Sequence, residues 1–206
     1  MGFLLRMGLG LAALAVVSVG LAAAADEAEE IAQAEALALA RYHEGFPPEY
    51  GAQIGDAGAA HLAELLEDAE YAKHHATLIE ALAASDWPGA YPALAAYDAR
   101  DRGEQIHAST LRALRALRVA MGRVARRDNR ALAWLLEDAS RHGPASFRAG
   151  PHDPDALGAR LRRQSLFGLG LSDRPAARAH LRGARAAADP ATARAARTAL
   201  GLGASR

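Results

Sequence analysis

Cysteine is absent from this 206-residue chain, and lysine occurs once, at Lys73. Without cysteine the protein cannot form a disulfide, a thiolate nucleophile, an iron–sulfur cluster, a cysteine zinc site or a lipid-modified N-terminal cysteine. Aromatic residues make up only 5% of the chain, and Val, Ile and Thr are also scarce, which argues against a β-sandwich or barrel. Hydrophobic residues reach 51%, and alanine, a strong helix former, supplies about a quarter of the chain. We therefore expect an all-α protein.

No residue pattern indicates a catalytic or cofactor site. The neighbours His74 and His75 point about 100° apart on a helix, so they do not easily face one metal. Ser85 and Ser172 each precede an aspartate, and we interpret both as helix caps rather than nucleophiles. A phosphate-binding glycine loop is missing, and we interpret Gly168-Leu169-Gly170 as the end of a helix. The sequence thus predicts a protein without a cofactor and without enzymatic activity.

The N-terminus predicts export from a bacterial cell. Arg6 gives the first residues one positive charge, and an uncharged apolar stretch covers residues 7–25. It ends in small residues, with Ala23 and Ala25 in the pattern of a signal-peptidase site, and Asp26 follows. We expect residues 1–25 to be a signal peptide and the mature protein to be periplasmic or secreted. The alternative is an uncleaved membrane anchor, because about 19 apolar residues can span a bilayer.

The rest of the chain predicts a series of amphipathic helices separated by short breaks. Apolar residues recur at helical spacing, and proline or glycine lies at most of the breaks. A Pro/Gly-rich loop over residues 143–155 interrupts the series. The helices are expected over residues 26–43, 58–67, 71–84, 89–97, 104–127, 129–140, 155–170, 175–187 and 190–200.

A shift of 87 residues aligns part of the chain with itself without a gap. Half of this shift, about 43 residues, is the length of one HEAT or armadillo unit. The matched pairs are Ile79 and Leu166, Leu82 and Leu169, Ser85-Asp86 and Ser172-Asp173, Pro88 and Pro175, Ala90 and Ala177, and Leu94 and Leu181.

These features make the chain resemble the HEAT-repeat family, in which antiparallel helix pairs stack into a curved solenoid. HEAT repeats usually place an aspartate in the turn between two helices and a basic residue soon after it. Asp68 with Lys73 fits this pattern loosely, Asp189 with Arg194 is one residue longer, and Asp138 lacks an arginine at the expected distance. Three stretches carry the resemblance, over residues 62–82, 166–181 and 189–201.

The resemblance implies an α-α superhelix of about four helix pairs over residues 51–206, preceded by a cap helix and linker over residues 26–50. Such solenoids mostly bind partners, so we expect a non-enzymatic protein-binding or scaffold module. The alternative is an enzyme or an accessory protein that handles a chromophore, like the HEAT-like bilin lyases or the metal oxygenases with His-Glu dipeptides. This chain has one such dipeptide, His43-Glu44, outside the best-matched stretches.

Charge is segregated along the chain although the formal net charge is zero. Residues 26–104 hold 17 acidic and 4 basic side chains, and residues 105–206 hold 7 acidic and 19 basic side chains. A basic end and an acidic end that lie far apart in a solenoid favour an acidic protein partner or weak head-to-tail self-association. The predicted export signal and the lack of base-stacking aromatics argue against nucleic acid. A membrane contact is expected only through an uncleaved signal segment.

Two groups of residues are therefore candidates for partner binding. Six arginines fall on one helical face if the helix that starts near Glu104 runs through Arg130. That face could instead be a solvated surface in contact with the acidic half. Phe147 and Arg148 lie in the 143–155 loop, which is either a tolerated insertion or a binding loop. The candidates are Arg112, Arg115, Arg123, Arg126, Arg127, Arg130, Phe147 and Arg148.

Overall fold

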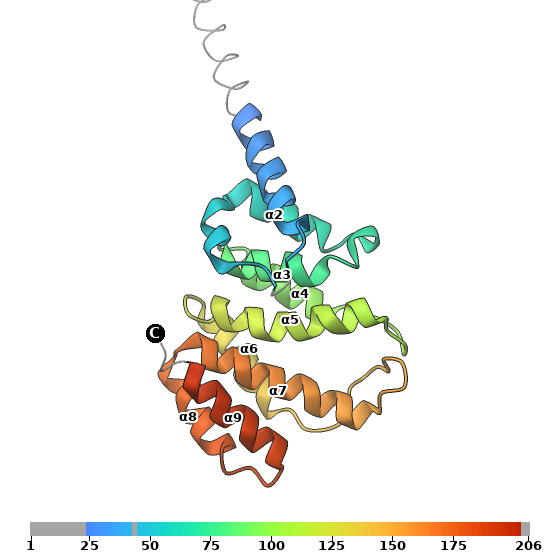
Figure 1. Cartoon of the computed structure of the whole chain (residues 1–206), viewed down its shortest axis with the longest axis vertical. Helices are drawn as coiled ribbons and strands as arrows, with labels where there is room; N and C mark the ends of the chain where they lie inside the picture. Colours follow the sequence, from blue (N-terminus) through green and yellow to red (C-terminus); the bar gives the residue numbers. More distant parts are fainter. Residues whose placement is uncertain (1–23, 43–44, 203–206) are drawn as a thin grey trace, which may run out of the picture.

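The computed structural model describes residues 24–42 and 45–202, and this part of the chain folds entirely into helices and loops (Figure 1). No strand is present among these residues, so the expected all-α class is confirmed. Residues 24–39 are helical. They are followed by η1 (Pro48–Gln53), α2 (Asp56–Leu65), η2 (Ala69–Tyr71), α3 (His75–Ala84), α4 (Ala90–Ala99), α5 (Ala108–Val124), α6 (Asn129–Ser140), α7 (Pro154–Ser172), α8 (Pro175–Ala184) and α9 (Pro190–Leu202).

The odd-numbered helices α3, α5, α7 and α9 pack side by side in that order (Figure 1). Each later even-numbered helix bridges two of them: α4 contacts α3 and α5, α6 contacts α5 and α7, and α8 contacts α7 and α9. The N-terminal helix projects from one end of this array, and α9 closes the other end. Packing therefore connects each helix mainly to elements one or two places away in the sequence.

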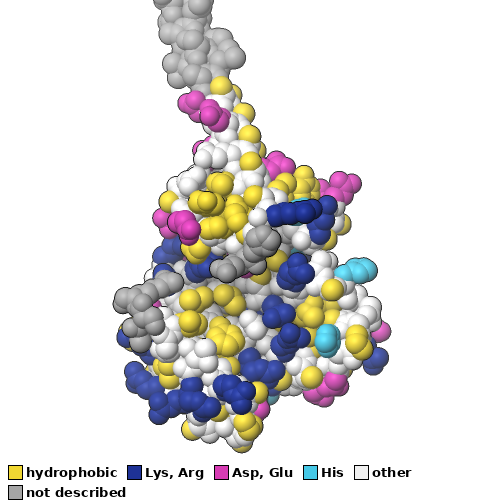
Figure 2. All heavy atoms as spheres, viewed as in Figure 1, with side chains coloured by type: hydrophobic (Ala, Val, Ile, Leu, Met, Phe, Trp, Pro, Cys, Tyr) yellow, Lys and Arg dark blue, Asp and Glu magenta, His cyan; other side chains and the backbone are white. Residues whose placement is uncertain are grey.

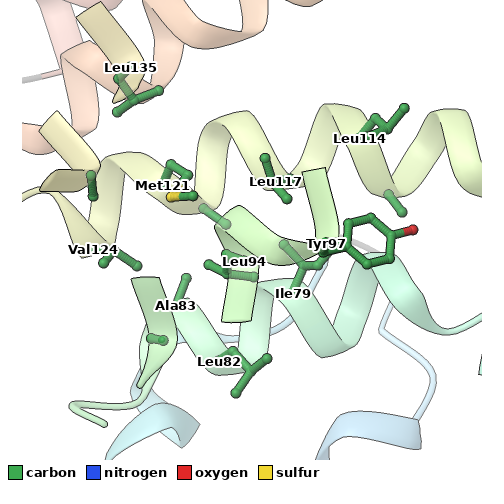
Figure 3. Packing of buried hydrophobic residues seen from close by; sticks show 14 of the residues in the cluster. Ile79, Leu82, Ala83, Leu94, Tyr97, Leu114, Leu117, Met121, Val124 and Leu135 are labelled. Atoms are coloured by element: carbon green, nitrogen blue, oxygen red, sulfur yellow. The ribbon is translucent and has the colours of Figure 1, made fainter. Parts of the chain in front are cut away.

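One continuous hydrophobic cluster runs through the array. Figure 3 shows its centre, where Ile79 of α3 and Leu94 of α4 lie beneath Leu117 and Met121 of α5. All four side chains are fully buried. Leucine and alanine supply most of this cluster, and Tyr97 of α4 is an aromatic side chain buried within it. The many small alanine side chains allow the helices to lie close together.

Every predicted helix is present with bounds that differ by up to four residues, and α6 has its bounds to the residue. The prediction for the helix over residues 104–127 was wrong at both ends, because α5 covers only Ala108–Val124. At its start, the Arg148 carbonyl accepts a hydrogen bond from the Ile106 amide at 2.9 Å, and the Glu104 carbonyl accepts one from the Arg148 amide at 2.7 Å. These bonds to a distant loop hold residues 104–106 outside the helix.

The residues matched by the 87-residue shift have equivalent surroundings. Leu82 and Leu169 are both fully buried, as predicted. The prediction that Ser85 and Ser172 cap the following helices was wrong. Each hydroxyl instead donates to a carbonyl three residues back in the preceding helix, Ser85 to Leu82 at 2.9 Å and Ser172 to Leu169 at 2.7 Å. The matched serines therefore make the same side-chain hydrogen bond at the ends of α3 and α7.

Glycines allow α7 to approach its neighbours at backbone distance. A Cβ atom on Gly168 would lie 2.2 Å from the carbonyl oxygen of Arg118, and one on Gly122 would lie 2.2 Å from the carbonyl oxygen of Gly168. A Cβ on Gly170 would lie 2.4 Å from the Ala199 carbonyl oxygen in α9. The interpretation of Gly168 and Gly170 as a helix end was therefore wrong, because α7 continues to Ser172.

The crossing of α5 and α7 predicts opposite effects for two Gly→Ala substitutions. Gly168→Ala should lower the free energy of unfolding by about 1–3 kcal/mol, since the added methyl group meets backbone. Gly183→Ala in α8, where a Cβ meets open space, should raise it by up to about 1 kcal/mol through helix propensity. Urea unfolding of both variants measures the difference. A Gly168→Ala variant with the same free energy of unfolding as the wild type would contradict the close approach of α5 and α7.

Candidate functional site

The six predicted arginines do not form one continuous stripe. The condition for it, a helix through Arg130, is not met, because α5 ends at Val124. Arg112, Arg115 and Arg123 share a face of α5 by helical spacing. Arg126 follows in the turn, and its Nε donates to the Leu171 carbonyl at 2.8 Å. Of these arginines, Arg115 lines a surface shared with α7, and Arg126 contacts α7 through Leu171.

Arg127 and Arg130 lie at a different place, beside α4. Arg127 donates to the Ser85 carbonyl, and its Nη1 lies 3.6 Å from an Asp86 carboxylate oxygen. The Arg130 guanidinium pairs with Asp128 at 2.7 Å and lies 4.8 Å from the centre of the Tyr91 ring. Both arginines thus have partners inside the fold that anchor the α5–α6 turn to the preceding helix pair.

A groove of about 360 Å³ opens where the arginine face of α5 meets α7 and α9. Its floor includes the aromatic ring of Phe167 and small residues of α9, and guanidinium groups come from all three helices. Figure 2 shows Lys and Arg side chains gathered over α5, α7 and α9. We call this surface the arginine groove; it is lined by Arg115, Arg160, Arg163, Gln164, Phe167, Ala191, Arg194, Ala195 and Thr198.

Positive charge in the arginine groove is poorly compensated. The Nε atom of Arg115 is buried and has no hydrogen-bond partner among the described residues. Burial lowers the pKa of Arg115, and the guanidinium groups of Arg160 and Arg112 lower it further. Within the described chain, the carboxylate paired with a lining arginine is Asp189, 4.0 Å from Arg163. The groove is therefore suited to an added anionic group.

Sequence reasoning found Arg115 but missed the other arginines of the groove. Arg160 and Arg163 lie on one face of α7 by i, i+3 spacing, and Phe167 lies one turn further on. This spacing was a usable signal within α7. The approach of α7 to α5, and of Arg194 from α9, depends on tertiary packing that helical periodicity does not contain.

The 143–155 loop lies on the other side of α7. Its Arg148 side chain is exposed, and its backbone pairs with residues 104–106. Phe147 is partly buried and faces a separate cavity of about 530 Å³ beside Asp98 and Arg118. The structure therefore does not bring Phe147 and Arg148 together with the predicted arginines, and the loop is tied down rather than free.

A buried ion pair lies between that cavity and the core. Arg118 donates to both carboxylate oxygens of Asp138, at 3.0 and 3.2 Å, and to the Leu114 carbonyl at 2.9 Å. Ser165 of α7 donates to the same carboxylate at 2.5 Å. Arg118 also lies 3.5 Å from an oxygen of Asp98, whose pKa is raised mainly by burial. These contacts join α4, α5, α6 and α7 and leave Arg118 fully paired.

The aspartates expected in HEAT-type turns have other roles. Asp68 caps η2 by accepting from the Glu70 amide at 2.8 Å. Asp189 caps α9 by accepting from the amides of Ala191 and Thr192. Asp138 is buried against an arginine that precedes it in the sequence by 20 residues. Neither Asp68 with Lys73 nor Asp189 with Arg194 forms a hydrogen bond or ion pair among the described residues.

The described residues contain neither a metal-binding cluster nor a helix able to span a membrane. No group of three or more His, Asp or Glu side chains there is arranged to hold a metal ion. His43-Glu44 lies outside the described residues, as do residues 1–23 of the predicted signal peptide. Of the helices that the structure describes, none combines the length and apolarity needed to cross a bilayer.

The buried ion pair predicts a sharp difference between adjacent residues of α6. Asp138→Ala should lower the free energy of unfolding by about 3–5 kcal/mol, since it leaves the Arg118 guanidinium buried without its partner. Glu137→Ala removes an exposed carboxylate paired with Arg141 and should change stability by at most about 0.5 kcal/mol. Thermal and urea unfolding of both variants measures this, and equal effects would contradict a structural ion pair.

Comparison with known proteins adds no relative. No protein-family model matches the chain, and neither a curated protein nor a solved structure is significantly similar to it.

Proposed function

We propose that this chain is an exported, non-enzymatic protein-binding module built as a HEAT-like α-solenoid. Three observations support the proposal: the packing of α3, α5, α7 and α9 in sequence order, the bridging position of the later even-numbered helices, and the matched burial of residues 87 positions apart. Solenoids present extended surfaces on which partners bind. A bacterial periplasmic or secreted location follows from the predicted signal peptide over residues 1–25.

The arginine groove is the proposed binding site, and the state of Arg115 is the observation that carries it. Burying part of the Arg115 guanidinium without a carboxylate partner costs free energy, and an anionic group bound in the groove would offset part of that cost by electrostatic attraction. Arg160 and Arg194 would add further charge-assisted hydrogen bonds. Guanidinium groups also bind carboxylates through paired N–H donors, which gives direction as well as attraction.

The floor of the groove favours a protein segment over a polyanion without side chains. Phe167 and the alanines of α9 offer apolar surface between the guanidinium groups. An amphipathic peptide can place an apolar side chain on that floor and carboxylates on the arginines around it. Phe167 is the groove's one aromatic lining residue, so a row of stacked bases has no platform there. The proposed partner is therefore an acidic protein segment.

The second function considered, an enzyme or chromophore-handling accessory, has no observation in its favour among the described residues. The large cavity beside Phe147 is lined by Asp98, Arg102 and Arg118. Arg102 donates to the carbonyls of Tyr97, Asp98 and Arg100, and Arg118 is held by Asp138. These cations stabilise the α4–α5 connection and the core, so their chemistry is accounted for by the fold.

Binding to the groove predicts a charge-specific loss of affinity. The probe is a fluorescent synthetic peptide with glutamates one helical turn apart around a leucine. The double variant Arg160→Gln/Arg194→Gln should bind it at least about tenfold more weakly, since each charge-assisted hydrogen bond contributes about 1.5 kcal/mol or more. The control Arg182→Gln/Arg185→Gln removes the same charge from exposed sites at the end of α8. Fluorescence anisotropy measures both, and equal weakening would contradict a groove site.

Export predicts the N-terminus of the mature protein. Cleavage after Ala25 should give a periplasmic or secreted form that begins at Asp26, as seen in the intact mass and N-terminal peptide of the native protein. Ala25→Arg should block processing, since signal peptidase requires a small residue there. Full-length protein retained in the membrane fraction would contradict cleavage and indicate an anchor.

A further inference from the structure

We propose that the arginine groove binds the acidic N-terminal helical segment, residues 26–36, of a second copy of this chain. This inference rests on the proposed function of the groove as a site for an acidic protein segment. It names that segment and makes the protein a head-to-tail assembly.

The N-terminal helix carries exposed acidic side chains that have no internal use. Residues 24–29 are exposed, and the helix projects from the body (Figure 1). Asp26, Glu27 and Glu29 have no hydrogen bond or ion pair among the described residues, whereas Glu30 accepts from the amides of Ala57 and Gly58. Glu30 therefore fixes the helix to the start of α2, and the carboxylates of Asp26, Glu27 and Glu29 remain available to bind another molecule.

The outward side of this helix is similar to the floor of the groove in its apolar character. Ala34 and Ala38 are fully buried against the body. Helical spacing places Ala32 and Ala36 on the opposite, exposed side. Small residues allow a helix to approach another surface closely. The exposed side is therefore a small apolar stripe, and the floor of the groove is apolar as well.

The spacing of charges also matches. Asp26 and Glu29 are three residues apart on the N-terminal helix, at the edge of the alanine stripe. Arg160 and Arg163 are three residues apart on α7, at the edge of the groove. Both spacings correspond to a rise of about 4.5 Å along a helix. Two carboxylates of one helix can therefore meet two guanidinium groups of the other.

The fold separates the two surfaces within one molecule. The N-terminal helix is held at α2, at one end of the helix array, and α9 forms the other end (Figure 1). Its acidic segment therefore meets the groove of another molecule. Such a contact joins two different surfaces, so it repeats in an open chain unless the rotation closes a ring.

The contact should be weak and sensitive to salt. A single helix face on a small groove buries less area than a stable dimer interface, which corresponds to dissociation constants of about 10 µM to 1 mM. The screening length falls from about 30 Å at 0.01 M salt to about 8 Å at 0.15 M. The sedimentation coefficient of the purified protein should therefore rise with concentration at low salt and fall to that of a monomer as salt is added.

Charge reversal tests the proposed pairing directly. One variant carries Asp26→Arg and Glu29→Arg, and the other carries Arg160→Glu and Arg163→Glu. Each variant alone should associate at least about tenfold more weakly than the wild type, because its helix and groove then have the same sign. An equimolar mixture should regain association, since each helix again finds a groove of opposite sign. The matched control, Arg182→Glu/Arg185→Glu on α8, should associate like the wild type.

The outcomes distinguish this inference from the proposed function. A protein that is monomeric at low salt up to about 1 mM, yet binds the acidic probe peptide through the groove, overturns self-association and leaves the binding site intact. Self-association that survives both charge reversals also overturns the inference. If the wild-type protein neither binds the peptide nor self-associates, both proposals are overturned. Circular dichroism of each variant checks that its helices are intact.

Discussion

Contact between the backbones of α5 and α7 determines the arrangement of the central helices. Gly122 and Gly168 meet where neither helix has room for a side chain. Because the two helices approach so closely at this point, Arg118 of α5 lies within reach of Asp138 on α6, whose carboxylate also accepts from Ser165 on α7. A bidentate ion pair then stabilises the crossing on the buried side of α5. The glycine contact and the buried ion pair thus both stabilise the packing of α5, α6 and α7.

The same crossing also forms the arginine groove, which lies along the contact between α5 and α7 and is completed by α9. Arg115 is two turns before Gly122, and Arg160 is about two turns before Gly168. Since the glycines are in contact, these two arginines come to the same level of the neighbouring helices. Their mutual repulsion is part of the reason why the pKa of Arg115 is lowered. Close packing therefore stabilises the core and concentrates positive charge on the surface.

Helical periodicity was sufficient to predict the elements but not their contacts. Asn129–Ser140 was predicted to the residue because polar breaks flank a clear apolar pattern. The start of α5 could not be predicted, since Ile106 is held by Arg148, more than 40 residues away. The groove was missed because its arginines come from three helices, and their alignment depends on glycines that were interpreted as a helix end.

The position of α9 at the end of the array makes the groove dependent on local stability. Within the described part of the chain, helix α9 packs against α7 and α8, and it supplies Arg194, Ala195 and Thr198 to the groove. Terminal elements open with lower free energy than the global unfolding of a protein. The rate of amide hydrogen exchange in α9 should therefore measure how often α9 opens and the groove loses this wall. Any ligand that spans α7 and α9 would slow that exchange.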